Sequence, residues 1–189
     1  MANQDSPFGL RAIGKIGQNR DNQGLAEFSI AASATAIYGQ DPVKALATGT
    51  IGVAAAGDTL LGSLNGVFFT AADTSKPTFA NHLNASNTAT DIVGFVSSDP
   101  YERFEIQSDN TTASAQTDVF MNYDITYAAG SSHDYLSGVE LDDSTTSTAS
   151  GQLRVVGVSK DIKNNDLTAS HVNFVVMINE HFLKQVAGV

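Results

Sequence analysis

Short runs of alternating apolar and polar residues are the feature that most constrains the fold of this 189-residue chain. In the segment RFEIQS, Phe104 and Ile106 alternate with Arg103, Glu105 and Gln107, which is the period of a strand with one buried face. Many short strands separated by glycine-containing and polar turns, without a strand–helix rhythm, are typical of all-β proteins. We therefore predict an all-β barrel or sandwich of short antiparallel strands, with at least about a quarter of the chain in strands.

Other segments refine this prediction. The run His171–Asn179 is apolar on both faces near its centre, so we expect it inside a sheet or at a subunit seam. At most one short helix is expected, at Pro42–Ala47, where proline suits a first helical turn. The polar, low-complexity run Asp142–Ser150 predicts an exposed loop, and Thr78–Thr90 predicts a second long loop. Weaker strand patterns occur at Ala26–Ile30, Thr35–Tyr38, Thr50–Ala54, Thr59–Gly62, Gly66–Thr70, Asp91–Val96, Val139–Leu141 and Leu153–Ser159.

Composition limits the chemistry of the chain. The absence of cysteine excludes disulfides, thiolate nucleophiles and cysteine-based metal centres. The hydrophobic fraction of 42% is ordinary for a globular protein, and the length suits one domain, with two small lobes as the alternative. Stability must therefore come from packing, strand hydrogen bonds or subunit contacts.

The net charge of −10 is unevenly distributed. Residues 21–150 carry three basic and sixteen acidic side chains, a net charge of −13, whereas residues 1–20 carry +2. An acidic body repels nucleic acid phosphates and anionic membranes, so we predict no nucleic acid partner and no membrane partner. The basic N-terminus either orients the protein toward an acidic surface or is simply solvated.

The N-terminal segment MANQDSPFGLR places apolar side chains on an irregular arm, because proline and glycine interrupt it. It lacks the apolar stretch of a signal peptide or an anchor. We predict an arm over residues 1–20 followed by a single β domain over 21–189. Two interpretations of the arm remain open: it covers the chain's own core, or it docks on a neighbouring subunit. The candidate contact residues are Pro7, Phe8, Leu10, Arg11 and Lys15.

At this point the sequence resembles a known family. The opening MANQDSPFGLR is similar to the start of the head decoration (cement) proteins of tailed bacteriophages, especially those of marine phages. The same resemblance extends to AAAGD with the following LNGVFFTA, to DPYERFEIQSD, and to RVVGVSKD with HVNFVVMINEHFL. These stretches are strand and turn signatures that span most of the chain. The resemblance implies a structural role on a virion and carries no catalytic residues.

Motifs for catalysis and ion binding are weak. The chain has no P-loop, no GxGxxG and no GxSxG elbow, so we predict no catalytic residues and no enzyme. His82, His133, His171 and His181 lack metal-ligand spacing, and we predict neither a metal site nor a cofactor. Acidic residues at Asp109 and at Asp142–Asp143 offer oxygen ligands for Ca²⁺, but they lack the spacing of a loop that wraps an ion.

The resemblance therefore implies a capsid decoration protein, made in the host cytoplasm and bound to the outer capsid surface of the virion. Its partners would be the major capsid protein and further copies of itself, most simply in a homotrimer. The alternatives are another virion component, in the tail or in head completion, and a β module that binds glycans or a host surface. A basic groove or an exposed aromatic row would favour the glycan alternative, and the sequence makes neither evident.

Overall fold

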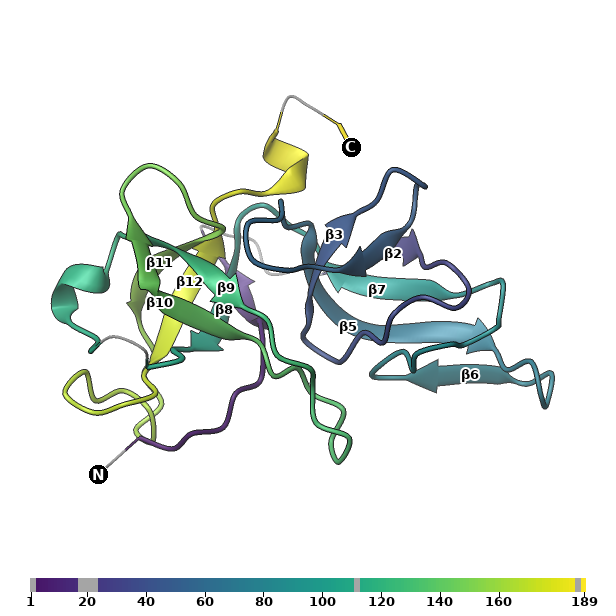
Figure 1. Ribbon diagram of the computed structural model, residues 1–189, viewed down its shortest axis with the longest axis horizontal. Helices are drawn as coiled ribbons and strands as arrows, with labels where there is room; N and C mark the ends of the chain where they lie inside the picture. Colours follow the sequence, from purple (N-terminus) through teal and green to yellow (C-terminus); the bar gives the residue numbers. More distant parts are fainter. Residues whose placement is uncertain (1–2, 17–23, 111–112, 186–187) are drawn as a thin grey trace.

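The computed structural model describes residues 3–16, 24–110, 113–185 and 188–189. Strands account for 41% of the structure and helical turns for 3%. Two antiparallel sheets pack together as in a sandwich, and neither closes into a barrel (Figure 1). The prediction of an all-β fold with more than a quarter of the chain in strands is confirmed.

The first sheet has six strands in the order β1-β8-β12-β11-β9-β10. Its strands are β1 (Arg11–Lys15), β8 (Glu102–Gln107), β9 (Asn122–Thr126), β10 (Glu140–Ser147), β11 (Leu153–Val158) and β12 (Asn173–Ile178). Strand β12 pairs with β8 on one side and with β11 on the other. The prediction that His171–Asn179 lies inside a sheet is thus confirmed.

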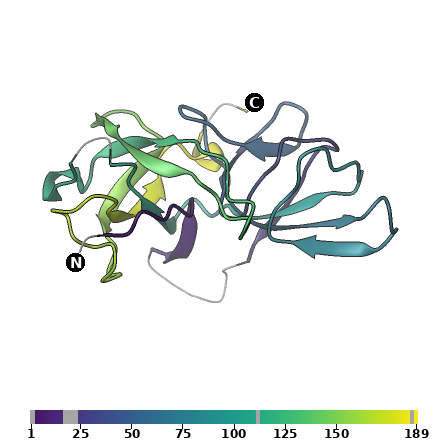
Figure 2. The same cartoon turned by 60° about the horizontal axis from the view of Figure 1, so that its bottom comes forward.

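The second sheet has the order β2-β7-β5-β3-β4, with β6 added beside β5. Its strands are β2 (Ala26–Ser29), β3 (Pro42–Ala45), β4 (Ile51–Val53), β5 (Gly62–Thr70), β6 (Pro77–Ala80) and β7 (Val93–Ser97). The long strand β5 pairs with β7 along one edge, while its other edge pairs first with β3 and then with β6. In Figures 1 and 2 the two sheets form lobes that lie side by side, with β6 at the outer end of the second lobe.

Each sheet buries a hydrophobic cluster of its own. The first cluster includes Phe104, Tyr123 and Phe174, and the second is built mostly from aliphatic side chains of the β2–β7 lobe. An isolated bridge between Ser108 and Leu141 brings the strand β10 back toward the end of β8, so the first sheet curls around its cluster. The single β domain predicted for residues 21–189 therefore contains two separately packed cores.

Two local predictions are wrong. Pro42–Ala47 does not form a helix, because Pro42–Ala45 is the strand β3, held between β4 and β5. The segment Asp142–Ser150 is not a free loop, because its first six residues belong to β10. A side-chain hydroxyl helps to bind this polar strand to β9, because the Asp124 backbone amide on β9 donates to the Thr145 hydroxyl over 2.8 Å. Tertiary pairing overrides local propensity in both segments.

Smaller differences concern boundaries. The expected loop Thr78–Thr90 contains most of the strand β6. The segments Thr35–Tyr38 and Thr59–Gly62, predicted as strands, form mainly isolated β-bridges, at Ile37 and Leu60. The expected arm ends in a regular strand, β1, and residues 17–20 of it lie outside the described part of the chain. Within the described ranges the chain also forms the short 3₁₀ turns η2 (Gln116–Asp118) and η3 (Phe182–Lys184).

Candidate functional site

The N-terminal segment lies on the body of its own chain. The Leu10 side chain is fully buried in the cluster of the first sheet. The Leu10 backbone amide donates to the Gln40 carbonyl over 2.9 Å, and the Leu10 backbone carbonyl accepts from the Ser63 hydroxyl over 2.6 Å. Gly9 permits this close approach, since its φ is +75° and a Cβ there would lie 2.4 Å from the Gln40 oxygen. Leu10 is therefore a core residue and presents no surface to a neighbour.

Of the other predicted contact residues, Pro7 and Phe8 are half-buried, and Arg11 and Lys15 form ion pairs within the chain. Phe8 lies half-buried, and the Arg11 guanidinium sits 4.5 Å from the centre of its ring. Arg11 also pairs with Glu105 on β8, and Lys15 pairs with Asp99 at 2.6 Å. Both cations are thus engaged within the chain. Pro7 is half-buried next to Phe8. These contacts match the interpretation in which the arm covers its own core.

A row of three phenylalanine rings crosses the second sheet on the face opposite its core. The rings belong to Phe95 on β7, Phe68 on β5 and Phe79 on β6. The centroids of Phe68 and Phe79 are 4.9 Å apart, and those of Phe79 and Phe95 are 5.7 Å apart with nearly parallel planes. Phe79 is 72% exposed. We call these three rings the phenylalanine row.

A shallow hollow of about 580 Å³ lies beside the row. Its lining includes the apolar residues Phe79, Phe95 and Leu25 and the polar residues Asn65 and Asn81. The Asn81 amide donates to the Asp134 carbonyl over 3.1 Å. The sequence analysis did not identify this surface. A signal was present in the pair Phe68-Phe69, because neighbouring side chains on a strand point to opposite faces and one ring had to leave the core.

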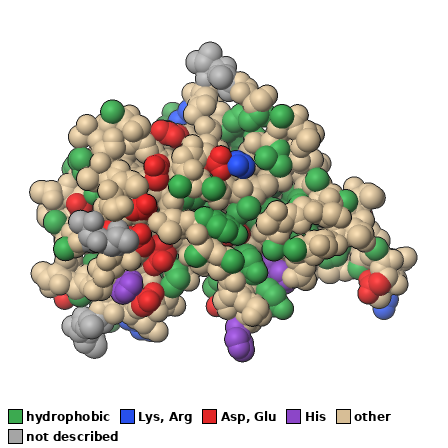
Figure 3. All heavy atoms as spheres, in the orientation of Figure 1, with side chains coloured by type: hydrophobic (Ala, Val, Ile, Leu, Met, Phe, Trp, Pro, Cys, Tyr) green, Lys and Arg blue, Asp and Glu red, His purple; other side chains and the backbone are tan. Residues whose placement is uncertain are grey.

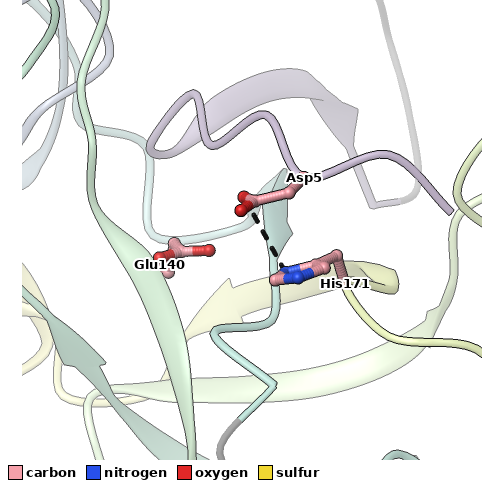
Figure 4. A group of neighbouring side chains, drawn as sticks. All are labelled: Asp5, Glu140 and His171. Atoms are coloured by element: carbon pink, nitrogen blue, oxygen red, sulfur yellow. Dashed lines mark ion pairs between the residues drawn. The ribbon is translucent and has the colours of Figure 1, made fainter.

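A second candidate site joins three distant segments of the chain. Asp5 comes from the N-terminal segment, Glu140 is the first residue of β10, and His171 precedes β12. Each offers one ligand atom, and these atoms all lie within 4.8 Å of one another. Figure 4 shows the Asp5 and His171 side chains facing one another, with Glu140 reaching toward the same space. The sequence contained no spacing signal for this group, because 135 residues separate Asp5 from Glu140.

The electrostatic environment of this second group is acidic. Burial raises the pKa of Glu140 to about 7, and the nearby carboxylates of Asp5, Asp109 and Asp143 add to the rise. The structure brings Asp109 and Asp143 together, since the Asp143 amide donates to an Asp109 oxygen over 3.3 Å. Figure 3 shows acidic side chains gathered over the lobe that contains β9 and β10. Positive charge would be stabilised here.

A separate buried acid, Asp41, lies at the start of β3. Burial raises its pKa from 3.8 to about 6, although hydrogen bonds from Ser137 and from the Tyr38 amide favour the charged form and oppose the rise. Because the pKa of Asp41 is higher in the folded state than in the unfolded state, protonation of this residue stabilises the folded state. The free energy of unfolding therefore falls as pH rises through the interval between the two pKa values.

We expect Asp41→Asn to remove this pH dependence. A pKa difference between 3.8 and about 6 corresponds to about 3 kcal/mol, so the variant should gain that much over the wild type between about pH 4 and pH 7. Urea unfolding of both proteins across this range measures the gain. Asp73→Asn, at an exposed turn, is the matched control and should follow the wild type. A gain that does not change with pH would contradict the assignment to Asp41.

In the described ranges, no helix has both the length and the apolar character needed to cross a membrane. Comparison of the chain with protein-family models, with curated protein sequences and with solved structures finds no match in any of the three.

Proposed function

We propose that this chain is a virion structural protein that binds the outer face of a bacteriophage head and stabilises the shell against the pressure of packed DNA. The resemblance of its N-terminus and of its strand signatures to head decoration proteins supports the proposal. The observation that carries it is the phenylalanine row, an exposed apolar surface on a body of net negative charge. Contiguous exposed apolar surfaces on otherwise polar proteins mark interaction sites.

The phenylalanine row fits a protein contact better than the arm does. Two of the arm's candidate residues, Arg11 and Lys15, are paired within the chain, and Leu10 is buried. In the row, Phe68 and Phe95 are half-buried, whereas Phe79 is 72% exposed and lies on β6, at an edge of its sheet. Large aromatic side chains at the centre of an interface contribute most of its binding free energy. We therefore assign the contact with the major capsid protein to the row.

Attachment at several points would make a weak contact effective. A homotrimer presents three rows, and each bound row raises the effective concentration of the next at the capsid surface. A shell subunit clamped by several copies is harder to pull away from its neighbours. The proposed location is the outer capsid surface, after synthesis in the host cytoplasm.

Replacing Phe79 by serine is expected to weaken head binding without unfolding the protein. Burial of a phenylalanine side chain contributes about 2 kcal/mol, so each binding site should lose about thirtyfold in affinity. Thermal stability should change little, because the ring is mostly exposed in the free chain. The measurement is cosedimentation of the purified protein with undecorated heads of the parent phage.

Phe120→Ser is the matched control. Phe120 is 76% exposed but lies outside the phenylalanine row, so this variant should bind heads as the wild type does. Equal head binding by Phe79→Ser and the wild type would refute the assignment of the contact to the row. Failure of the wild-type protein itself to bind heads would refute the proposed function.

One observation favours a second candidate, glycan binding. Asn65 lines the hollow together with Phe79 and Phe95, which combines ring faces with a hydrogen-bonding side chain as small-molecule sites do. A glycan-array signal that Phe79→Ser abolishes, together with unchanged head binding, would select this candidate over capsid attachment.

A further inference from the structure

Two carboxylates and one imidazole converge where the N-terminal segment crosses the first sheet. The ligand atoms of Asp5, Glu140 and His171 lie within 4.8 Å of one another, and the Asp5 Oδ1 to His171 Nδ1 distance is 3.8 Å. We propose that these residues bind a divalent transition-metal ion that ties the N-terminal segment to β10 and β12. The inference is independent of head binding.

Two of the three ligand-bearing side chains carry a buried polar atom without a hydrogen-bond partner. Glu140 Oε1 and His171 Nδ1 are both buried, and neither makes a hydrogen bond. Buried polar atoms in folded proteins are almost always satisfied, so two unsatisfied atoms in one group call for a missing partner. A metal ion between them would satisfy both atoms at once.

The donor set indicates the class of ion. Two carboxylates and one imidazole suit Zn²⁺ or Mn²⁺, whereas Ca²⁺ and Mg²⁺ prefer oxygen ligands throughout. Zinc lies about 2.0–2.2 Å from nitrogen and carboxylate ligands, so its ligand atoms are less than about 4.4 Å apart. The Asp5 side chain, which is 66% exposed, is free to make the small closing movement that the cluster needs. Water would complete the coordination.

The surrounding charge also favours a cation. Asp109 and Asp143 add negative charge around Glu140 and are held in place by other contacts. The Thr126 hydroxyl donates to Asp109, and the Ser108 hydroxyl donates to Asp143 over 2.7 Å. These two carboxylates therefore contribute a fixed negative field, while Asp5, Glu140 and His171 supply the ligands.

The test uses the full chain after removal of metal with a chelator that is then dialysed away. We expect ZnCl₂ or MnCl₂ to bind with one-to-one stoichiometry and a Kd in about the micromolar range in titration calorimetry, and to raise the melting temperature. CaCl₂ and MgCl₂ should bind at least about tenfold more weakly. Absence of binding by both transition metals up to about 1 mM, or preference for Ca²⁺ or Mg²⁺, would overturn the proposal.

Variants separate this site from adventitious binding. His171 has a φ of +57°, a conformation that asparagine tolerates, so His171→Asn removes the imidazole with little change in the backbone. Asp5→Asn acts on an exposed side chain and leaves the core intact. Each variant should weaken metal binding at least about tenfold. The control His133→Asn, at an exposed histidine, should bind as the wild type does, and wild-type affinity in His171→Asn would overturn the assignment.

Discussion

Replacing Leu10 by alanine is expected to lower the free energy of unfolding by about 2–5 kcal/mol, which is the range for a buried leucine in a well-packed core. Leu10 is fully buried and packs in the cluster of the first sheet, although it lies only ten residues from the start of the chain. Deletion of its side chain leaves a cavity that the surrounding strands cannot fill without moving. Urea unfolding at constant pH measures the change.

Ile13→Ala supplies the control for this prediction. Ile13 lies three residues further along the same segment and is 45% exposed, so its truncation should change stability by less than about 1 kcal/mol. If the N-terminal segment were a docking arm without a role in folding, Leu10→Ala and Ile13→Ala would have equally small effects. That result would contradict the packing of Leu10 described above.

A similarly large effect is expected for Gln152→Leu. The Gln152 side chain is fully buried and connects the lobes: its amide donates to the carbonyls of Ala55 and Asp58 over 2.9 and 2.7 Å. Its carbonyl oxygen accepts from the Ile125 amide over 3.1 Å. Leucine removes the bonds to the Ile125 amide and the Asp58 carbonyl, each costing about 1–3 kcal/mol, whereas the exposed Ala55 carbonyl still accepts from the Asp58 amide. We expect a loss of at least about 2 kcal/mol in chemical unfolding.

Gln185→Leu is the comparison for Gln152→Leu. Gln185 is exposed, and the hydrogen bond described for its side chain is a single 3.2 Å contact to the Thr59 hydroxyl. This variant should therefore remain within about 0.5 kcal/mol of the wild type. Similar stability for the two glutamine variants would show that the lobes do not depend on the Gln152 contacts.

The Leu10 prediction bears on function through the N-terminal segment. A segment that packs on its own core is not a free arm, so the proposed capsid contact is assigned to another surface. The phenylalanine row is the exposed surface suited to that contact, since Phe79 is exposed and stacks with Phe95. The proposed metal ion would act with Leu10, because Asp5 lies on the same segment and would anchor its beginning.

Local sequence patterns were sufficient for the fold class and for several strands. The alternation around Phe104 and Ile106 predicts β8, and both side chains are fully buried. The apolar run that contains Val172 and Phe174 predicts a central strand, because both of its faces must leave water. Such predictions succeed because the period of two is a property of the strand itself.

Where local pattern and long-range pairing disagree, pairing decides. Pro42 suits the first turn of a helix, but its neighbour Val43 pairs with Val53 and Gly62 in the second sheet. The polar run after Leu141 suits a loop, but β9 supplies a partner for it. These outcomes depend on residues that are distant in the sequence, and a local pattern carries no information about them.

The sequence by itself determined that the chain is all-β, that its body is acidic, and that cysteine chemistry is excluded, because periodicity, charge and composition are properties of the residues alone. Only the tertiary structure decided that Leu10 belongs to the core, that three phenylalanine rings share one exposed face, and that Asp5, Glu140 and His171 meet. Each of these juxtapositions joins segments through strand register and packing. A single residue of register shift reverses which face a side chain occupies, so these positions follow from the assembled sheets.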